Sequence, residues 1–181
     1  MNQMPIIKTE RLILRPFNLS DENEVQRLAG NIAIAEMTLN IPYPYKDGIA
    51  GEWIKTHKEK YEEGKMLNLA ITDRTDNYLI GAIGLSIKKE YDIGELGYWI
   101  GKPYWNKGYC TEAAEVILDY GFKKMHLNRI YATHLKKNPA SGKVMKKIGM
   151  KKEGILRQHV KKWGEYEDLV YYGLLKSEFI R

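Results

Sequence analysis

The chain has 181 residues, of which 44% are hydrophobic and 29% are charged. These values suit a globular protein with a sizeable core, and we predict a single domain over residues 1–181. The one cysteine excludes an internal disulfide and a cysteine-based metal site. No apolar run approaches the length of a membrane span, and the start, MNQMPIIKTE, lacks the apolar region of a signal peptide. We therefore expect a cytoplasmic protein with no membrane partner.

The net charge is +6 and the pI is near 9.2. A basic surface suits polyanionic partners such as nucleotide cofactors, ribosomes or nucleic acid. Solvated surface lysines account for most of this charge, and the chain carries no RNA-recognition signature. The sequence therefore does not favour direct nucleic-acid binding.

The first half of the chain predicts a strand, two helices and a meander. Residues 9–17 form the strand, and Ser20 is expected to cap a helix that extends to Ile32. Asp47 is expected to cap a second helix, in which His57 is a packed and hydrogen-bonded residue. Three antiparallel strands follow, over 67–73, 78–87 and 94–101.

The second half predicts a helix over 109–125, a strand over 129–135 and a further helix that Asn138 caps. A hairpin over 150–160 and 166–176 completes the chain. The order of these elements indicates an α+β fold.

The stretch from Gly94 to Met125 combines a strand, a loop and a helix N-terminus, which together favour an anion site. The first helical turn has free backbone N–H groups. Gly108 lets the backbone approach a phosphate without a Cβ in the way, and Thr111 adds a hydroxyl. A P-loop is excluded because it needs Gly-Lys-Ser/Thr, which Lys107-Gly108-Tyr109 does not supply, and a dinucleotide fingerprint needs more glycines than this loop has.

The loop Trp105-Asn106-Lys107-Gly108-Tyr109-Cys110 resembles the acetyl-CoA site of the GNAT N-acetyltransferase family, which carries Gln/Arg-x-x-Gly-x-Gly/Ala. Residues 105–113 are more similar to the RimJ/RimL-like branch, whose loop often reads Trp-Gly-Lys-Gly-Tyr-Ala-Thr-Glu-Ala, and differ from it at Asn106 and Cys110. The string TERLILRP at 9–16 also resembles the opening strand of that branch. This resemblance covers nearly the whole chain and implies the GNAT fold, with a mixed central sheet of about seven strands and flanking helices.

The same resemblance implies acetyl-CoA as the co-substrate. Backbone at Ile100 would pair with the pantetheine arm, and backbone over 106–111 would hold the pyrophosphate. The segment NPASGKVMKKIGM at 138–150 resembles the second cofactor element of the family, although Asn138 also suits a pure helix cap. The implied cofactor-binding residues are Ile100, Lys102, Asn106, Lys107, Gly108, Tyr109, Cys110, Thr111, Asn138 and Ser141.

Two residues are candidates for catalysis. Many GNAT enzymes place a tyrosine four residues after the Ser141 position to protonate the departing thiolate, but Met145 stands there and cannot donate a proton. Ser141 is the nearest candidate acid, as in RimL-like enzymes, and its alternative role is a local backbone bond. Glu95 is the candidate base, or else a carboxylate that faces solvent. Cys110 has no neighbouring histidine in sequence and is expected to be a small loop residue and not a nucleophile.

The sequence thus predicts an N-acetyltransferase that moves an acetyl group from acetyl-CoA to a primary amine. The favoured acceptor is a protein N-terminal α-amino group, such as that of a ribosomal protein, because its pKa of about 7.7–8.0 leaves part of it neutral near pH 7. Tyr166, Asp168 and Tyr172 alternate along the last strand and are candidates to face this acceptor.

Other functions remain open at this point. A small-molecule amine, either a polyamine or an aminoglycoside, is an alternative acceptor. A basic ribosome- or RNA-binding module without catalysis is an alternative of another class, as is a sensor that binds CoA without turnover. His126, His134 and His159 do not have a metal-ligand spacing, so no metal is predicted. The oligomeric state stays open, a homo-oligomer included.

Overall fold

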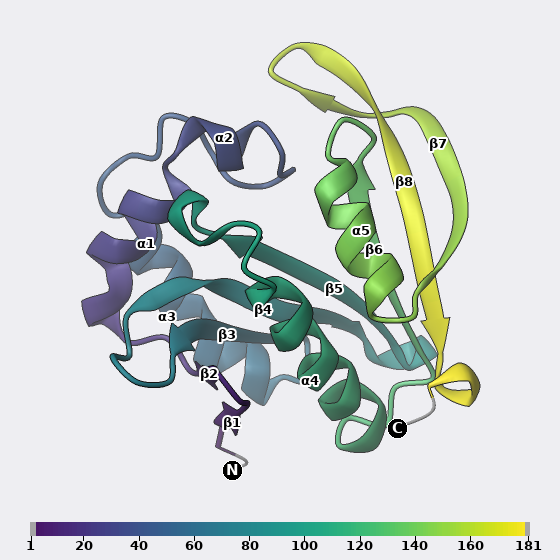
Figure 1. The fold of residues 1–181 in the computed structure, drawn as a ribbon, viewed down its shortest axis with the longest axis horizontal. Helices are drawn as coiled ribbons and strands as arrows, with labels where there is room; N and C mark the ends of the chain where they lie inside the picture. The colour runs from purple at the N-terminus through teal and green to yellow at the C-terminus, as the bar shows by residue number, and fades with distance from the viewer. Residues whose placement is uncertain (1–2, 180–181) are drawn as a thin grey trace.

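The computed structural model describes residues 3–179, in which helices cover both faces of one eight-stranded sheet (Figure 1). The strands are β1 (Ile7–Lys8), β2 (Leu12–Arg15), β3 (Met66–Asp73), β4 (Leu79–Lys88), β5 (Ile93–Ile100), β6 (Arg129–Leu135), β7 (Lys151–Lys162) and β8 (Glu165–Leu175). The helices are α1 (Glu22–Ala29), α2 (Ile32–Ala35), α3 (Ile49–Glu62), α4 (Tyr109–Lys123) and α5 (Pro139–Lys147). The predicted α+β plan is confirmed, with eight strands where about seven were expected. Within residues 3–179, no helix is long and apolar enough to cross a membrane.

The sheet has the order β1-β2-β3-β4-β5-β6-β8-β7. Every neighbouring pair is antiparallel except β5 and β6, which run parallel. The predicted meander is therefore confirmed as β3, β4 and β5. The final hairpin also forms as predicted, because Trp163 and Gly164 at its tip adopt the positive φ angles that two-residue hairpin turns require.

The additional strand, β1, lies just before the predicted strand over 9–17, of which only Leu12–Arg15 forms β2. That segment contains a turn, in which the Thr9 hydroxyl accepts a hydrogen bond from the Leu12 N–H at 2.9 Å. The turn reverses the chain, so β1 before it pairs with β2 after it. A two-residue strand carries too little alternation to be recognised from sequence.

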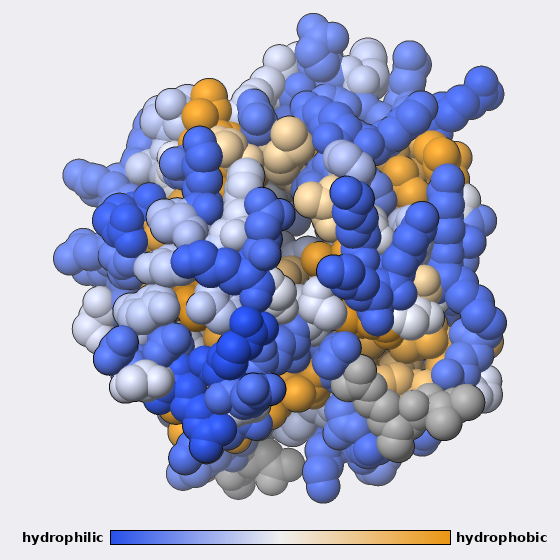
Figure 2. Space-filling model, in the orientation of Figure 1, coloured by the Kyte–Doolittle hydropathy of each residue, from blue (hydrophilic) through white to orange (hydrophobic). Residues whose placement is uncertain are grey.

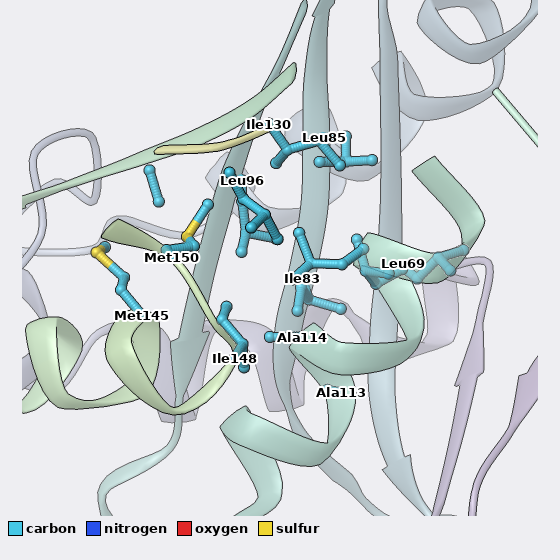
Figure 3. Packing of buried hydrophobic residues seen from close by; sticks show 14 of the residues in the cluster. Leu69, Ile83, Leu85, Leu96, Ala113, Ala114, Ile130, Met145, Ile148 and Met150 are labelled. Atoms are coloured by element: carbon cyan, nitrogen blue, oxygen red, sulfur yellow. The ribbon is translucent and has the colours of Figure 1, made fainter. Parts of the chain in front are cut away.

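The larger core lies between the sheet and helices α4 and α5 (Figure 3). Ala113 and Ala114 of α4 are fully buried, and their small side chains let the helix approach the strands closely. From the side of α5, Met145 enters the same cluster with 1% of its surface exposed. Each large apolar side chain that is fully buried here stabilises the fold by about 1.5–3 kcal/mol.

A second cluster covers the opposite face of the sheet, where α1 and α3 pack. Successive side chains of a strand point to opposite faces, so the two clusters separate the residues of β5 by parity. Leu96 and Ile100 belong to the α4 and α5 side, and Trp99 packs against the α1 and α3 side. This division decides which candidate residues of β5 share a face.

The predicted start of the first helix is wrong. Ser20 lies inside a short 3-10 turn and does not cap a helix. The carboxylate of Asp21 instead accepts from the Asn18 N–H at 2.8 Å and pairs with Arg15 at 2.8 Å. These contacts of Asp21 were not visible in sequence because the arginine that orients this carboxylate comes from β2.

The predicted end of that helix and the cap of the next one are also wrong. Asn31 accepts from the Ala33 N–H at 3.0 Å and starts a new helix, so Ile32 belongs to α2 and not to α1. Gly48, with φ of 83°, is the residue that precedes α3, and Asp47 accepts a hydrogen bond from Gln26 at 2.7 Å. Asp47 thus serves a contact between elements and does not cap α3.

Candidate active site

The sheet opens between β5 and β6. Their parallel pairing covers Ile93 to Glu95 against Arg129 to Tyr131 and then stops, although both strands continue. Figure 1 shows the two strands diverging from this closed end, with α5 over the gap. The opening is expected where a parallel pair loses its register in a twisted sheet, and it exposes one edge of β5.

The backbone of β5 faces this opening with alternate residues. The Gly101 N–H donates to the Ile80 carbonyl of β4 at 2.8 Å. Because backbone groups of neighbouring residues point to opposite edges, those of Ile100 and Tyr98 point toward the gap. An extended ligand can add to such an edge as a strand would. The Ile100 carbonyl already accepts from the indole N–H of Trp105 at 2.6 Å, so the Ile100 N–H is the group left for a ligand.

The predicted anion site forms at the start of α4. Gly108 has φ of 81° and precedes the helix without a side-chain cap. The first intrahelical bond at this end runs from the Glu112 N–H to the Gly108 carbonyl at 3.1 Å. The N–H groups of the residues between them therefore point out of the helix end, where they and the helix dipole favour an anion.

Glu112 fixes this loop to the opening segment of the chain. Its carboxylate accepts from the Thr9 hydroxyl at 2.6 Å, and from the Arg11 N–H at 2.9 Å and side chain at 2.7 Å. Arg11 also donates to the Lys107 carbonyl at 2.9 Å. Although partial burial opposes it, these hydrogen bonds hold the pKa of Glu112 below its ordinary value. The two sequence segments that carry the family resemblance are thus in contact, and neither Arg11 nor Glu112 was predicted as a site residue.

The predicted cofactor residues of the loop form a continuous rim from the end of β5 to the first turn of α4. Most of their side chains are exposed or half-buried. Burial raises the pKa of the Cys110 thiol, which therefore stays protonated and makes a poor nucleophile. The members of this rim are Ile100, Lys102, Asn106, Lys107, Gly108, Tyr109, Cys110 and Thr111.

Asn138 caps α5, as predicted. Its side-chain oxygen accepts from the Ser141 N–H at 3.3 Å, and its amide donates to the Met37 carbonyl at 3.1 Å. The side chain thus ties α5 to the segment after α2. Both ends of the amide are engaged within the protein, so a contact of this side chain with the cofactor stays a prediction.

Ser141 points toward β5. Its Oγ lies 2.8 Å from the Tyr98 hydroxyl, which is also 3.2 Å from the Ser141 carbonyl. Burial raises the pKa of Tyr98, so the phenol remains protonated. Sequence reasoning missed Tyr98 because its alternation with Leu96 and Ile100 matches an ordinary core position.

Glu95 lies on the opposite face of β5. Its carboxylate accepts from the Tyr131 hydroxyl at 3.0 Å. Burial and the nearby Glu95 charge raise the pKa of Tyr131 to about 12, which keeps this donor protonated. Tyr131 stacks on Tyr171 with ring centroids 6.2 Å apart. The two candidate catalytic residues, Glu95 and Ser141, are therefore presented from opposite sides of one strand.

The candidates on the last strand, Tyr166, Asp168 and Tyr172, lie on the face of the sheet opposite to that of Glu95, and Tyr166 is 63% exposed. Tyr172 belongs to the core under α5 and contacts His134, and Asp168 pairs with Lys136 at 3.0 Å. Tyr171 is the residue of β8 that shares a face with Glu95. The pairing of β8 with β6 decides this face, and it cannot be read from the alternation of β8 alone.

Residues 11–151 match the protein family described as the acetyltransferase (GNAT) domain. The uncharacterized N-acetyltransferase YnaD of Bacillus subtilis strain 168 is 34% identical over 177 residues, which are 96% of this chain and 98% of that protein. The [ribosomal protein uS5]-alanine N-acetyltransferase of Escherichia coli K12 is 25% identical over 96% of this chain and 92% of its own. A crystal structure of a GNAT-family acetyltransferase from Bacillus anthracis has a TM-score of 0.84 at 30% identity, covering 96% of this chain and all of the other.

The chain therefore belongs to the GNAT acetyltransferase family and is an N-acetyltransferase that uses acetyl-CoA. The residues fit this co-substrate, because an edge of extended backbone leads to a helix end that attracts anions. Figure 2 shows a hollow on the same face, between the loop before α4 and α5. Hydrophilic side chains stand around it (Figure 2). Helix α5 carries the exposed Lys143, Lys146 and Lys147.

Proposed function

We propose that this enzyme acetylates protein N-terminal α-amino groups, with ribosomal-protein N-termini as the favoured substrates. The position of Glu95 carries the proposal. The E. coli relative, a [ribosomal protein uS5]-alanine N-acetyltransferase, supports it.

Charge on the acceptor side of the sheet favours a substrate with one amine. Glu153 is ion-paired with Arg129, and Glu167 is ion-paired with Lys137. Glu95 is bonded to a neutral tyrosine, and within residues 3–179 it has no ion-pair partner. A polyamine carries several ammonium groups and would need several unpaired carboxylates to compensate its desolvation. Glu95 offers one carboxylate of β5 to one amine.

The proposed base and the proposed donor to the thiolate act from opposite faces of β5. The Ile100 N–H is placed to polarise the thioester carbonyl, and the loop and first turn of α4 hold the pyrophosphate. Glu95 takes a proton from the amine, directly or through water. Ser141, on the α5 side, is the proposed hydroxyl donor to the departing thiolate. An α-amino group depends less on this base than a lysine amine would, because about a tenth of it is already neutral at pH 7.

The other predicted contacts are part of the same proposal. Lys102, Lys107 and the backbone from Asn106 to Thr111 line the phosphate end of the site, and Asn138 lines its far side. The single domain over 1–181 and the cytoplasmic location stay predictions. A homo-oligomer is likewise untested.

The test is release of CoA thiol from acetyl-CoA with matched acceptors. One peptide begins with Ala and contains a lysine, and its partner is identical except that the α-amino group is blocked. We expect turnover with the free peptide and none with the blocked one. Glu95→Gln should lower kcat on the free peptide by about 100-fold, the lower end of what a general base contributes. Preferred turnover of spermidine or of the blocked peptide would contradict the proposed acceptor.

A further inference from the structure

The hydroxyl groups of Tyr98 and Ser141 form a pair, in which the proposed chemistry uses Ser141 and gives Tyr98 no role. Tyr98 Oη lies 2.8 Å from Ser141 Oγ, and both residues are partly buried. The backbone of Ser141 is held by the Asn138 cap in the first turn of α5. The pair thus joins the edge of β5 to the helix that covers the opening.

Each hydroxyl has one proton, so the pair has two arrangements. In one, Tyr98 donates to the Ser141 carbonyl at 3.2 Å, and Ser141 then donates its own proton to Tyr98. In the other, Tyr98 donates to Ser141 Oγ across the shorter distance of 2.8 Å. Only the second arrangement leaves the Ser141 proton free for a ligand.

The surroundings favour hydrogen bonding over transfer of either proton. Burial raises the pKa of Tyr98, and a serine hydroxyl is a still weaker acid. Two titratable side chains pack against this region, Cys110 from α4 and His134 from β6. Burial raises the pKa of Cys110 and lowers that of His134, so both are neutral near pH 7 and neither supplies a competing charge.

We propose that Tyr98 is a positioning residue that donates to Ser141 Oγ and so directs the Ser141 proton to the sulfur that departs from the acetyl group. The inference rests on the proposed role of Ser141. The lone pair of the amine nitrogen forms a bond to the acetyl carbonyl carbon, and the C–S bond then breaks. Its electron pair stays on sulfur as a thiolate, which the Tyr98 to Ser141 chain stabilises. The amine proton goes to Glu95, and solvent later protonates the thiolate. Chains of hydrogen bonds strengthen one another in a site of low dielectric constant.

The direct test measures the thiol pKa of bound CoA, which ultraviolet absorbance of the thiolate reports without any acceptor. We expect the wild-type protein to lower this pKa below that of free CoA. Tyr98→Phe should raise the thiol pKa of bound CoA by about one unit, back toward that of free CoA, and Ser141→Ala should do the same. Tyr120→Phe removes another tyrosine hydroxyl, 3.4 Å from that of Tyr61, and should leave the thiol pKa unchanged.

Kinetics give the second readout. Tyr98→Phe should lower kcat about tenfold with the KM for acetyl-CoA unchanged, and the double variant should be no slower than Ser141→Ala alone, because the two residues act as one unit. A wild-type thiol pKa in Tyr98→Phe would overturn the inference. If Tyr98→Phe fails to fold, an unchanged thiol pKa in Ser141→Ala overturns it equally. Failure of the peptide assay alone would refute the proposed acceptor, and the CoA titration would still decide the role of Tyr98.

Discussion

His57 should make the stability of this protein depend on pH. It is 4% exposed in α3, and among residues 3–179 neither of its ring nitrogens has a hydrogen-bond partner. Its ring packs against Trp53 and Phe17, with centroids 4.4 and 5.4 Å apart. It is packed as predicted from sequence, but the predicted hydrogen bond is wrong. Burial lowers the pKa of His57 from 6.5 to about 4.

The sign follows from proton uptake. Between about pH 6.5 and 4 the unfolded chain binds a proton at His57 that the folded protein does not, so the free energy of unfolding falls as pH falls. The full shift corresponds to about 3 kcal/mol, of which about 2 kcal/mol is already lost at pH 5. This loss is a large part of the stability of an ordinary domain.

Urea unfolding at pH 7 and pH 5 measures the effect. His57→Phe should keep the packing and remove the titration, so its loss between the two pH values should be about 2 kcal/mol smaller than that of the wild type. His134, which is also buried, titrates in both proteins and cancels in this comparison. His159→Phe alters an exposed histidine and should follow the wild-type curve. Parallel curves for the wild type and His57→Phe would refute the reasoning.

Two further predictions concern the loop before α4. Gly108→Val should cost about 1–2 kcal/mol of stability, because its φ is 81°, and should weaken acetyl-CoA binding about tenfold in calorimetry. Gly149→Val is the control, because Gly149 has a φ of 88° and open space around its Cβ position. It should lose similar stability and keep the binding constant for acetyl-CoA unchanged. Equal losses of binding in both variants would contradict an anion site at Gly108. Glu112→Gln should cost about 1.5–3 kcal/mol in urea unfolding because Arg11 loses its charged partner. Asp119→Asn removes an exposed ion pair with Lys123 and should cost well under 1 kcal/mol. A similar cost for both changes would contradict the structural role given to the contact between Glu112 and Arg11.

Local sequence patterns predicted most of the fold. Alternation marked β3, β4 and β5, and Gly108 marked the boundary between loop and helix, because each of these signals lies within a few neighbouring residues. The errors at Ser20 and Asp47 have another origin. Those two side chains are good caps by type, but residues from other elements decide where the helices begin.

The candidate site was predicted where it is continuous in sequence and missed where it is not. The rim from Ile100 to Thr111 follows from one motif. The pair of Tyr98 and Ser141 joins residues 43 positions apart, and no periodicity links a strand tyrosine to a helix serine. The wrong face given to Tyr172 reflects the order β6-β8-β7, which is a property of the whole sheet.

The central claim is that acetyl-CoA binds in the opening between β5 and β6, with its phosphates at the start of α4. Thermal unfolding with and without acetyl-CoA tests it most directly, beside ATP and NAD as controls. At a hundredfold excess over Kd, binding should add about 2.7 kcal/mol and raise Tm by roughly 5–10 °C for a domain of this size. The account predicts this rise with acetyl-CoA alone, and about half of it in Gly108→Val at the same concentration, because tenfold weaker binding adds only about 1.4 kcal/mol. No rise with acetyl-CoA, or an equal rise with ATP, would contradict it.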